Sequence, residues 1–120
     1  MKKSVYKQVF DILKDNNIDV YEPGQKKGIC KSPYVVLKMG GVNDLEIVSS
    51  ERPIYIMMAY VPEHNYSMLE TFIHDVKEVL KKAYPMIMYA GNETESFFDD
   101  DLKAHMSQFM YQGIRKINYR

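Results

Sequence analysis

Three consecutive carboxylates, Asp99, Asp100 and Asp101, come closer to metal chemistry than any other run in this chain. Adjacent carboxylates could contribute to a Mg²⁺ or Ca²⁺ site, because both cations prefer oxygen ligands. Neighbouring side chains diverge, however, and the twelve-residue calcium-loop pattern is absent. A restriction-type nuclease site would need a Glu-x-Lys sequence, which does not occur in the chain. We therefore predict that the three aspartates form a solvated turn before a strand.

The chain has a single cysteine, Cys30, and three histidines, His64, His74 and His105. One cysteine rules out an intramolecular disulfide and fits a reducing compartment. Nearby lysines could lower the pKa of this thiol, but a catalytic cysteine also needs an oriented base and a third group. No two histidines stand at metal-ligand spacing. We expect an incidental thiol, no metal site and no cofactor.

Lys26, Lys27 and Lys31 make a small basic loop within residues 23–32. The plain interpretation is a solvated loop. The sharper hypothesis is a surface that contacts phosphates, since lysines neutralise nucleic-acid backbone charge without reading sequence. Both interpretations remain open from the residues alone.

The chain of 120 residues is near the common size of a single domain, and we treat residues 1–120 as one domain. Lysine plus arginine and aspartate plus glutamate both number 16, so the formal net charge is zero. This balance argues against a dedicated nucleic-acid binder and weakens repulsion between copies. The first residues do not resemble a signal peptide, and the longest apolar run, residues 54–61, is far shorter than a membrane span. We expect a soluble protein made in the cytoplasm.

Residues 67–83 carry the clearest secondary-structure pattern, an apolar face at helical spacing. Ser67 and Glu70 form a capping-box sequence at its start. Lys81 and Lys82 lie in its last turn, where cations favour the helix dipole, and Pro85 prevents continuation. The pattern predicts an amphipathic helix that packs on a sheet.

The other elements are predicted from periodicity and turn residues. They are a helix at 4–16 that stops at Asn16-Asn17, strands at 18–21, 34–39, 54–61 and 86–90, and a long strand at 103–117; loops at 23–32 and 91–101; turns at Gly40-Gly41, Asn43-Asp44 and 49–53; and a short strand at 45–48.

This order predicts an α+β fold: one mixed, mostly antiparallel sheet of about five strands, with two helices packed on one face. Residues 54–61 are apolar at successive positions, which is typical of a strand buried on both faces. Two helices can cover only one of these faces. We expect a second copy of the chain or a partner protein to cover the other.

Ten tyrosines and nine methionines occur without any tryptophan. Methionine fills irregular cores and tyrosine suits half-buried sheet positions, yet both are also enriched at protein interfaces. The residues therefore leave a core role and an interface role open. The candidate self-assembly surface consists of Tyr55, Met57, Tyr60, Met106, Phe109, Met110 and Tyr111.

Several segments, in their order and character, resemble the tail terminator (tail completion) proteins of long-tailed phages and prophages. The segments are SPYVVLKM, PIYIMMAYV, YSMLETFIHDVKEVL, GNETESFFDDDLKAH and MSQFMYQGIRKI, which follow an N-terminal helix. The resemblance spans nearly the whole chain, from Val5 to Ile117, and rests on pattern rather than on a catalytic signature.

The resemblance implies a non-enzymatic protein that forms a ring, typically a hexamer. Such a ring ends the tail tube and joins it to the head, with a tail tube protein and a head-completion protein as partners. It implies a place in the cytoplasm of the bacterial host during assembly and then in the virion tail. DNA would pass through the ring channel without sequence readout, and Lys26, Lys27 and Lys31 are the candidates to line it. The alternatives are a related head–tail connector, a nucleic-acid-binding accessory protein and, last, an enzyme using Asp99–Asp101 or Cys30.

Overall fold

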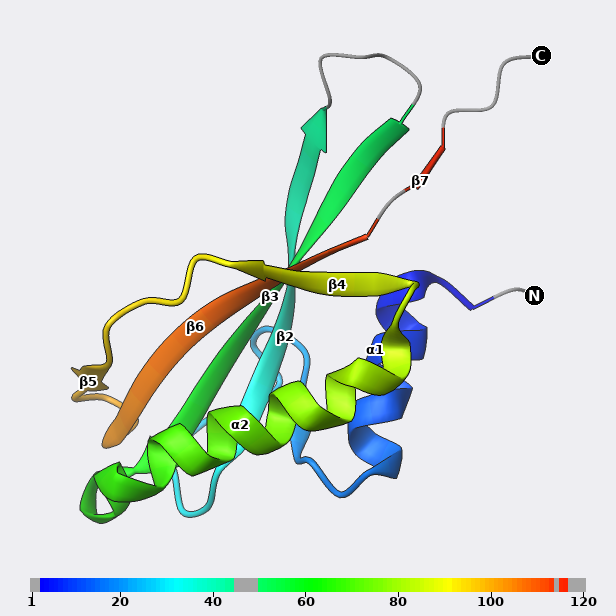
Figure 1. Ribbon diagram of the computed structural model, residues 1–120. Helices are drawn as coiled ribbons and strands as arrows, with labels where there is room; N and C mark the ends of the chain where they lie inside the picture. The colour runs from blue at the N-terminus through cyan, green and yellow to red at the C-terminus, as the bar shows by residue number, and fades with distance from the viewer. Residues whose placement is uncertain (1–2, 45–49, 114, 117–120) are drawn as a thin grey trace.

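The computed structural model describes residues 3–44, 50–113 and 115–116 of the chain. The predicted α+β architecture is confirmed, since α1 and α2 lie on one face of a single mixed sheet (Figure 1). The sheet has the order β1-β2-β3-β6-β4, with β5 beside β6 and β7 beside β3. The β1–β2 pair is parallel and the other pairs are antiparallel. The helices are α1 (Val5–Asp15) and α2 (Leu69–Leu80), and the strands are β1 (Val20–Tyr21), β2 (Tyr34–Asp44), β3 (Ser50–Pro62), β4 (Ile87–Gly91), β5 (Phe97–Asp99), β6 (Ala104–Gly113) and β7 (Arg115–Lys116).

The first helix begins and ends as its sequence predicts. Ser4 is the N-cap, and its hydroxyl accepts a hydrogen bond from the Lys7 amide at 3.1 Å. Asn16 is the C-cap, and Asn17 follows in the left-handed conformation at φ 65°, which asparagine tolerates better than most residues. The hydroxyl of Tyr6 donates to the Leu37 carbonyl at 2.7 Å, which ties α1 to β2.

The second helix lies where the sequence predicts it, but the predicted capping box is wrong. Its N-cap is Met68, with no side-chain capping bond. A 3₁₀ helix, Glu63–Met68, leads directly into α2, and the Leu69 amide bonds to the Tyr66 carbonyl. Because this preceding turn already supplies backbone acceptors, the first turn of α2 does not depend on a side-chain cap.

The predicted turns at Gly40-Gly41 and Asn43-Asp44 are also wrong, because β2 continues through both. The ladder with β3 shifts register between Met39 and Val42, a β-bulge at the two glycines. Gly41 has φ +92°, which a residue with a side chain rarely adopts. In place of the predicted turn at 49–53, β3 already runs from Ser50. The short strand predicted at 45–48 lies outside the described residues.

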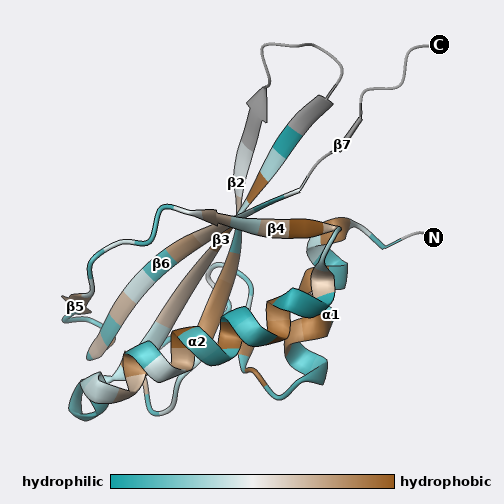
Figure 2. Cartoon of the chain, in the orientation of Figure 1, coloured by the Kyte–Doolittle hydropathy of each residue, from teal (hydrophilic) through white to brown (hydrophobic). Residues whose placement is uncertain are grey.

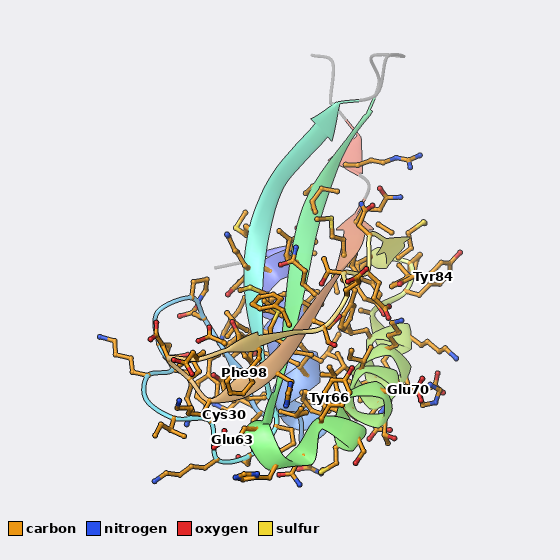
Figure 3. All side chains as sticks on the ribbon, turned by 90° about the vertical axis from the view of Figure 1, so that its left-hand side faces the viewer. Cys30, Glu63, Tyr66, Glu70, Tyr84 and Phe98 are labelled. Carbon is orange, nitrogen blue, oxygen red and sulfur yellow. The ribbon has the colours of Figure 1, made fainter. Side chains whose placement is uncertain are left out.

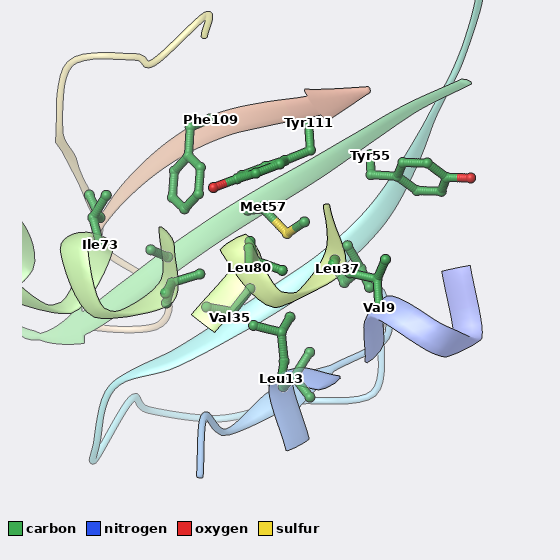
Figure 4. Packing of buried hydrophobic residues seen from close by; sticks show 14 of the residues in the cluster. Val9, Leu13, Val35, Leu37, Tyr55, Met57, Ile73, Leu80, Phe109 and Tyr111 are labelled. Carbon is green, nitrogen blue, oxygen red and sulfur yellow. The ribbon is translucent and has the colours of Figure 1, made fainter. Parts of the chain in front are cut away.

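The main core fills the space between the helices and the sheet (Figure 4). Met57 and Phe109 face each other across β3 and β6 and have no exposed area. Val9 and Leu13 from α1 and the buried face of α2 close over them. Figure 2 shows the corresponding pattern, with hydrophilic and hydrophobic residues alternating along α2. The buried residues of α2 are Leu69, Ile73, Val76 and Leu80.

The opposite face of the sheet is covered at one end by the chain itself. Cys30, Tyr34, Tyr60, Ala104 and Met106 belong to a second buried cluster on this face. The loop between β1 and β2 is fixed here, since the Cys30 amide donates to the carbonyl of Leu102 at 2.7 Å. The expectation that another chain must cover this face is therefore wrong for this end.

Toward the middle of the same face, the cover is incomplete. Ile56, Met58 and Met110 are only half-buried there, and Lys38 is exposed beside them. Both faces of β3 are thus apolar, as the sequence predicts. From Tyr55 to Val61 the helix-facing side chains are all buried, whereas the other face is covered only in part.

The central position of Phe109 gives a direct test of this core. Phe109→Ala should lower the free energy of unfolding by about 3–5 kcal/mol, because it leaves a cavity between the helices and the sheet. Phe97→Ala, at a side chain 50% exposed on β5, is the matched control and should change it by about 0.5 kcal/mol or less. Chemical denaturation measures both. Equal losses for the two variants would contradict the assigned core.

Candidate functional surfaces

The three lysines of the basic loop do not share one environment. The ammonium of Lys26 lies 5.4 Å from the ring centroid of Tyr21 and 5.7 Å from that of Tyr34. A cation held over two rings gains a favourable electrostatic contact within the chain. Lys27 and Lys31 are exposed. The loop therefore offers two solvent-facing charges, while Lys26 helps to hold the loop on the sheet.

Cys30 lies inside the second cluster and is only 3% exposed. Its thiol donates to the Ser32 carbonyl at 3.3 Å. Burial raises the pKa of this thiol, and the Ser32 contact and the charge of Lys26 only partly oppose that effect. A thiol with a raised pKa holds little thiolate at neutral pH, so it is a poor nucleophile. Cys30 is a packing residue here, as expected.

The three aspartates form a turn between β5 and β6, as predicted. Asp99 accepts hydrogen bonds from the amides of Asp101 and Leu102 at 3.0 and 3.1 Å. Asp100 pairs with Lys103 at 2.9 Å and is strongly exposed. The carboxylate of Asp99 is thus engaged with its own backbone, in the manner of an Asx turn.

The histidines lie on different parts of the surface. His105 packs against the rings of Tyr66 and Phe98, with centroid distances of 4.7 and 5.1 Å. Its Nε2 lies 3.0 Å from the carbonyl oxygen of Glu63. His74 is exposed on α2. In the part of the chain that the structure describes, no cluster of three or more His, Cys, Asp or Glu residues could hold a metal ion.

Most of the candidate self-assembly surface lies in the interior. Met57 and Phe109 have no exposed area, and Tyr55 and Tyr111 are 4% and 5% exposed beneath the helices. A side chain without exposed area cannot contact a second copy, so the surface expectation is wrong for Met57 and Phe109, and Tyr55 and Tyr111 are core residues with little exposed area. Successive side chains along β3 and β6 point to opposite faces of the sheet, and these four positions point toward the helices.

The remaining three members of that set lie on the opposite face. Tyr60 and Met106 belong to the second buried cluster, and Tyr60 stacks on Tyr34 at a centroid distance of 4.9 Å. Only Met110 keeps partial exposure, where the amide of Asn92 donates to its sulfur at 3.5 Å. Of the seven residues, Met110 alone has a side chain that is more than slightly exposed in the folded chain.

The most exposed large apolar side chains lie outside the seven residues of the candidate self-assembly surface, and they were not predicted from the sequence as a contact surface. Tyr84 is 66% exposed and projects from the body just before β4 (Figure 3), and Tyr89 on β4 is 45% exposed. One sequence signal could have indicated this site, because residues 83–91 contain no charged side chain. Met39 on β2 is also exposed, at 62%.

A groove of about 650 Å³ lies between α2 and β4. Its floor is apolar, formed by Leu80, Ile87 and Tyr111. Burial raises the pKa of Tyr111 to about 12, so this hydroxyl stays neutral at physiological pH. The rim is charged and polar, and it includes His74, Lys77, Glu78 and Lys81.

Lys77 and Glu93 connect the helix to the loop after β4. The ammonium of Lys77 forms an ion pair with Glu93 and lies 4.7 Å from the ring centroid of Tyr89. The hydrogen bond from Lys77 lowers the pKa of the Glu93 carboxyl. The Tyr89 hydroxyl donates to the same carboxylate at 2.9 Å. These contacts fix Tyr89 against α2 at one end of the groove.

In comparisons with known proteins, the chain matches no protein-family model, and no curated protein is similar enough to count as a relative. Within the described ranges, neither helix is long and apolar enough to cross a membrane.

The buried state of Cys30 can be tested with a disulfide reagent. At pH 7 the folded protein should react at least about 100-fold more slowly than the protein unfolded in denaturant, because the reagent reaches the thiol only when the loop opens. The absorbance of the released thiolate measures both rates. Rapid reaction of the folded protein would show an accessible, activated thiol and would contradict this placement.

Proposed function

We propose that this chain is a non-enzymatic assembly protein that forms a ring, a hexamer, at the end of a phage or prophage tail. In this role it ends the tail tube and joins it to the head, with a tail tube protein and a head-completion protein as partners. It acts in the cytoplasm of the bacterial host during assembly and then in the virion tail. The observation that carries the proposal is the element order, in which a helix, three strands, a second helix and four further strands build one α+β domain; this order is compatible with the resemblance.

The shape of the sheet supports contact between copies. The ends of β2 and β3 extend beyond the part of the sheet that the helices cover, and they form a projecting arm (Figure 1). The molecule measures 54 × 30 × 25 Å along its principal axes. A two-stranded ribbon is marginally stable alone, and Met39 at the base of this arm is strongly exposed. Such an arm gains stability when a neighbouring subunit packs against it.

The chemistry of the polar groups supports a structural rather than an enzymatic role. Asp99 is engaged in a turn, and Cys30 is buried with a raised pKa. His105 is enclosed by two aromatic rings and bonded to a backbone carbonyl. Each of these groups has a local structural partner that accounts for its position.

Assembly can be measured directly on the purified protein. Light scattering after size-exclusion chromatography should give the mass of a hexamer, and negative-stain electron microscopy should show rings with a central opening. Mixing with purified tail tubes should place the ring at the tube end, whereas a head–tail connector would bind emptied heads instead. A protein that stays monomeric at high concentration in several buffers would contradict the proposal.

A nucleic-acid-binding accessory role is the second candidate, because Lys27 and Lys31 are exposed on one loop. If DNA only passes through a ring, Lys27→Ala/Lys31→Ala should weaken DNA binding equally for all sequences. The slope of the logarithm of the binding constant against the logarithm of the salt concentration should fall by the amount expected for about two lost phosphate contacts. Fluorescence anisotropy over a salt series measures this effect. Lys14→Ala/Lys38→Ala removes two exposed lysines elsewhere and is the matched control. Sequence-selective binding by the monomer would favour the accessory role, and no binding at low salt would exclude any DNA contact by this loop.

A further inference from the structure

The outer edge of β4 is an unprotected end of the sheet. Among the strands that the structure describes, β4 pairs with β6 alone and is the last strand in the order of the sheet. Its ladder is regular from Ile87 to Tyr89, and a register shift follows before Gly91. Natural edge strands are usually guarded by lysines or other charges, yet β4 has none. The other end of the sheet differs, because β2 carries Lys38 and a bulge.

The surroundings of this edge are suited to a protein strand rather than to water. Tyr84 and Tyr89 are exposed beside it, and the apolar groove against α2 runs along the same edge. An added strand would supply the backbone hydrogen bonds that an edge lacks and would bury both tyrosines. The required occupant is therefore an extended strand with apolar neighbours.

The charges at the two ends of β4 identify which strand fits. Lys81 and Lys82 end the helical segment just before β4, and Glu93 and Glu95 follow the strand. All four are substantially exposed, and Lys81 lines the groove beside β4. Within the chain, Lys81 pairs with Glu78, Lys77 pairs with Glu93, and Lys82 donates to the side chain of Asn16 at the end of α1. Contacts between solvent-exposed charged side chains are weak, so they can rearrange when a partner binds.

We propose that the β4 edge binds the β4 edge of a second copy of this chain, antiparallel, about a two-fold axis near Met88. Antiparallel pairing places the lysines at the start of one β4 beside the glutamates at the end of the other, twice in each dimer. Both grooves and both pairs of tyrosines are then buried in one isologous contact, and the two α2 helices lie on the same face of a continuous sheet. This contact goes beyond the proposed function, because it does not depend on a phage tail. The same contact could form an isolated dimer or join two rings.

Charge reversal tests the contact. The variants Lys81→Glu/Lys82→Glu and Glu93→Lys/Glu95→Lys should each weaken self-association by about tenfold or more, because like charges then face each other at both ends. An equimolar mixture of the two variants should recover wild-type affinity, since both ends are again complementary in the heterodimer. Analytical ultracentrifugation measures the three dissociation constants.

Two controls separate this result from misfolding. Lys27→Glu/Lys31→Glu reverses two exposed lysines of the loop between β1 and β2 and should leave the β4 contact unchanged. Circular dichroism verifies the fold of every variant. If the loss of the Lys77–Glu93 pair destabilises the Glu93→Lys/Glu95→Lys variant, the single variants Glu95→Lys and Lys81→Glu replace the double variants. Each should weaken self-association, and their equimolar mixture should recover it.

Crosslinking tests the position of the axis. Met88→Cys places one thiol of each copy near the two-fold axis, where mild oxidation should give a covalent dimer on a non-reducing gel. The same substitution at Met39 on β2 should give none. Absence of crosslinking at residue 88 would overturn the proposed axis.

The outcomes also separate this contact from the proposed ring. Rings that persist with unchanged affinity in both charge-reversed variants, without recovery on mixing, would overturn the β4 contact and leave the ring intact. A dimer that depends on these charges but never forms rings would support the β4 contact and contradict the tail role. A strict monomer would contradict both.

Discussion

The burial of β3 on both of its faces is the constraint on which the rest of this structure depends. Its helix-facing side meets Phe109 and the apolar surfaces of α1 and α2, and its other side meets the cluster around Tyr60. A strand with two apolar faces cannot be stable at the border of a sheet, because one flank and one face would remain in water. β3 therefore lies at the centre, with β2 and β6 beside it. Both helices and the loop after β1 are held in place by the surface that this strand presents.

The covering of the second face determines where several of the candidate reactive side chains lie. Closing the loop over Tyr34 and Tyr60 requires Cys30 to be buried and Lys26 to lie over the rings of Tyr21 and Tyr34. The turn of Asp99 supports the opposite wall of the same cluster through Leu102. Cys30, Lys26 and Asp99 thus each have a local packing or hydrogen-bonding partner.

The two ends of the sheet differ in a way that matters for association. The β2 end has a lysine, a bulge and a short parallel partner, which all discourage further pairing. The β4 end is uncharged and adjoins an apolar groove with two exposed tyrosines. A neutral chain does not repel its own copies. The asymmetry of the edges thus makes one end of the sheet much more suited to contact than the other.

Local sequence determined the helices, the strand cores, the caps of α1 and the double-sided burial of residues 54–61, because periodicity and turn chemistry act over a few neighbouring residues. The tertiary structure alone decided which apolar residues are exposed. Met57 and Phe109 are indistinguishable in sequence from interface residues, yet they are buried because the helices close over their face of the sheet. Tyr84 and Tyr89 are exposed because β4 is at the edge, and strand order is set by long-range pairing that periodicity does not encode. The same limit applies to the turn predicted at Gly40 and Gly41: a glycine pair suits a turn or a bulge, and only the pairing of β2 with β3 selects the bulge.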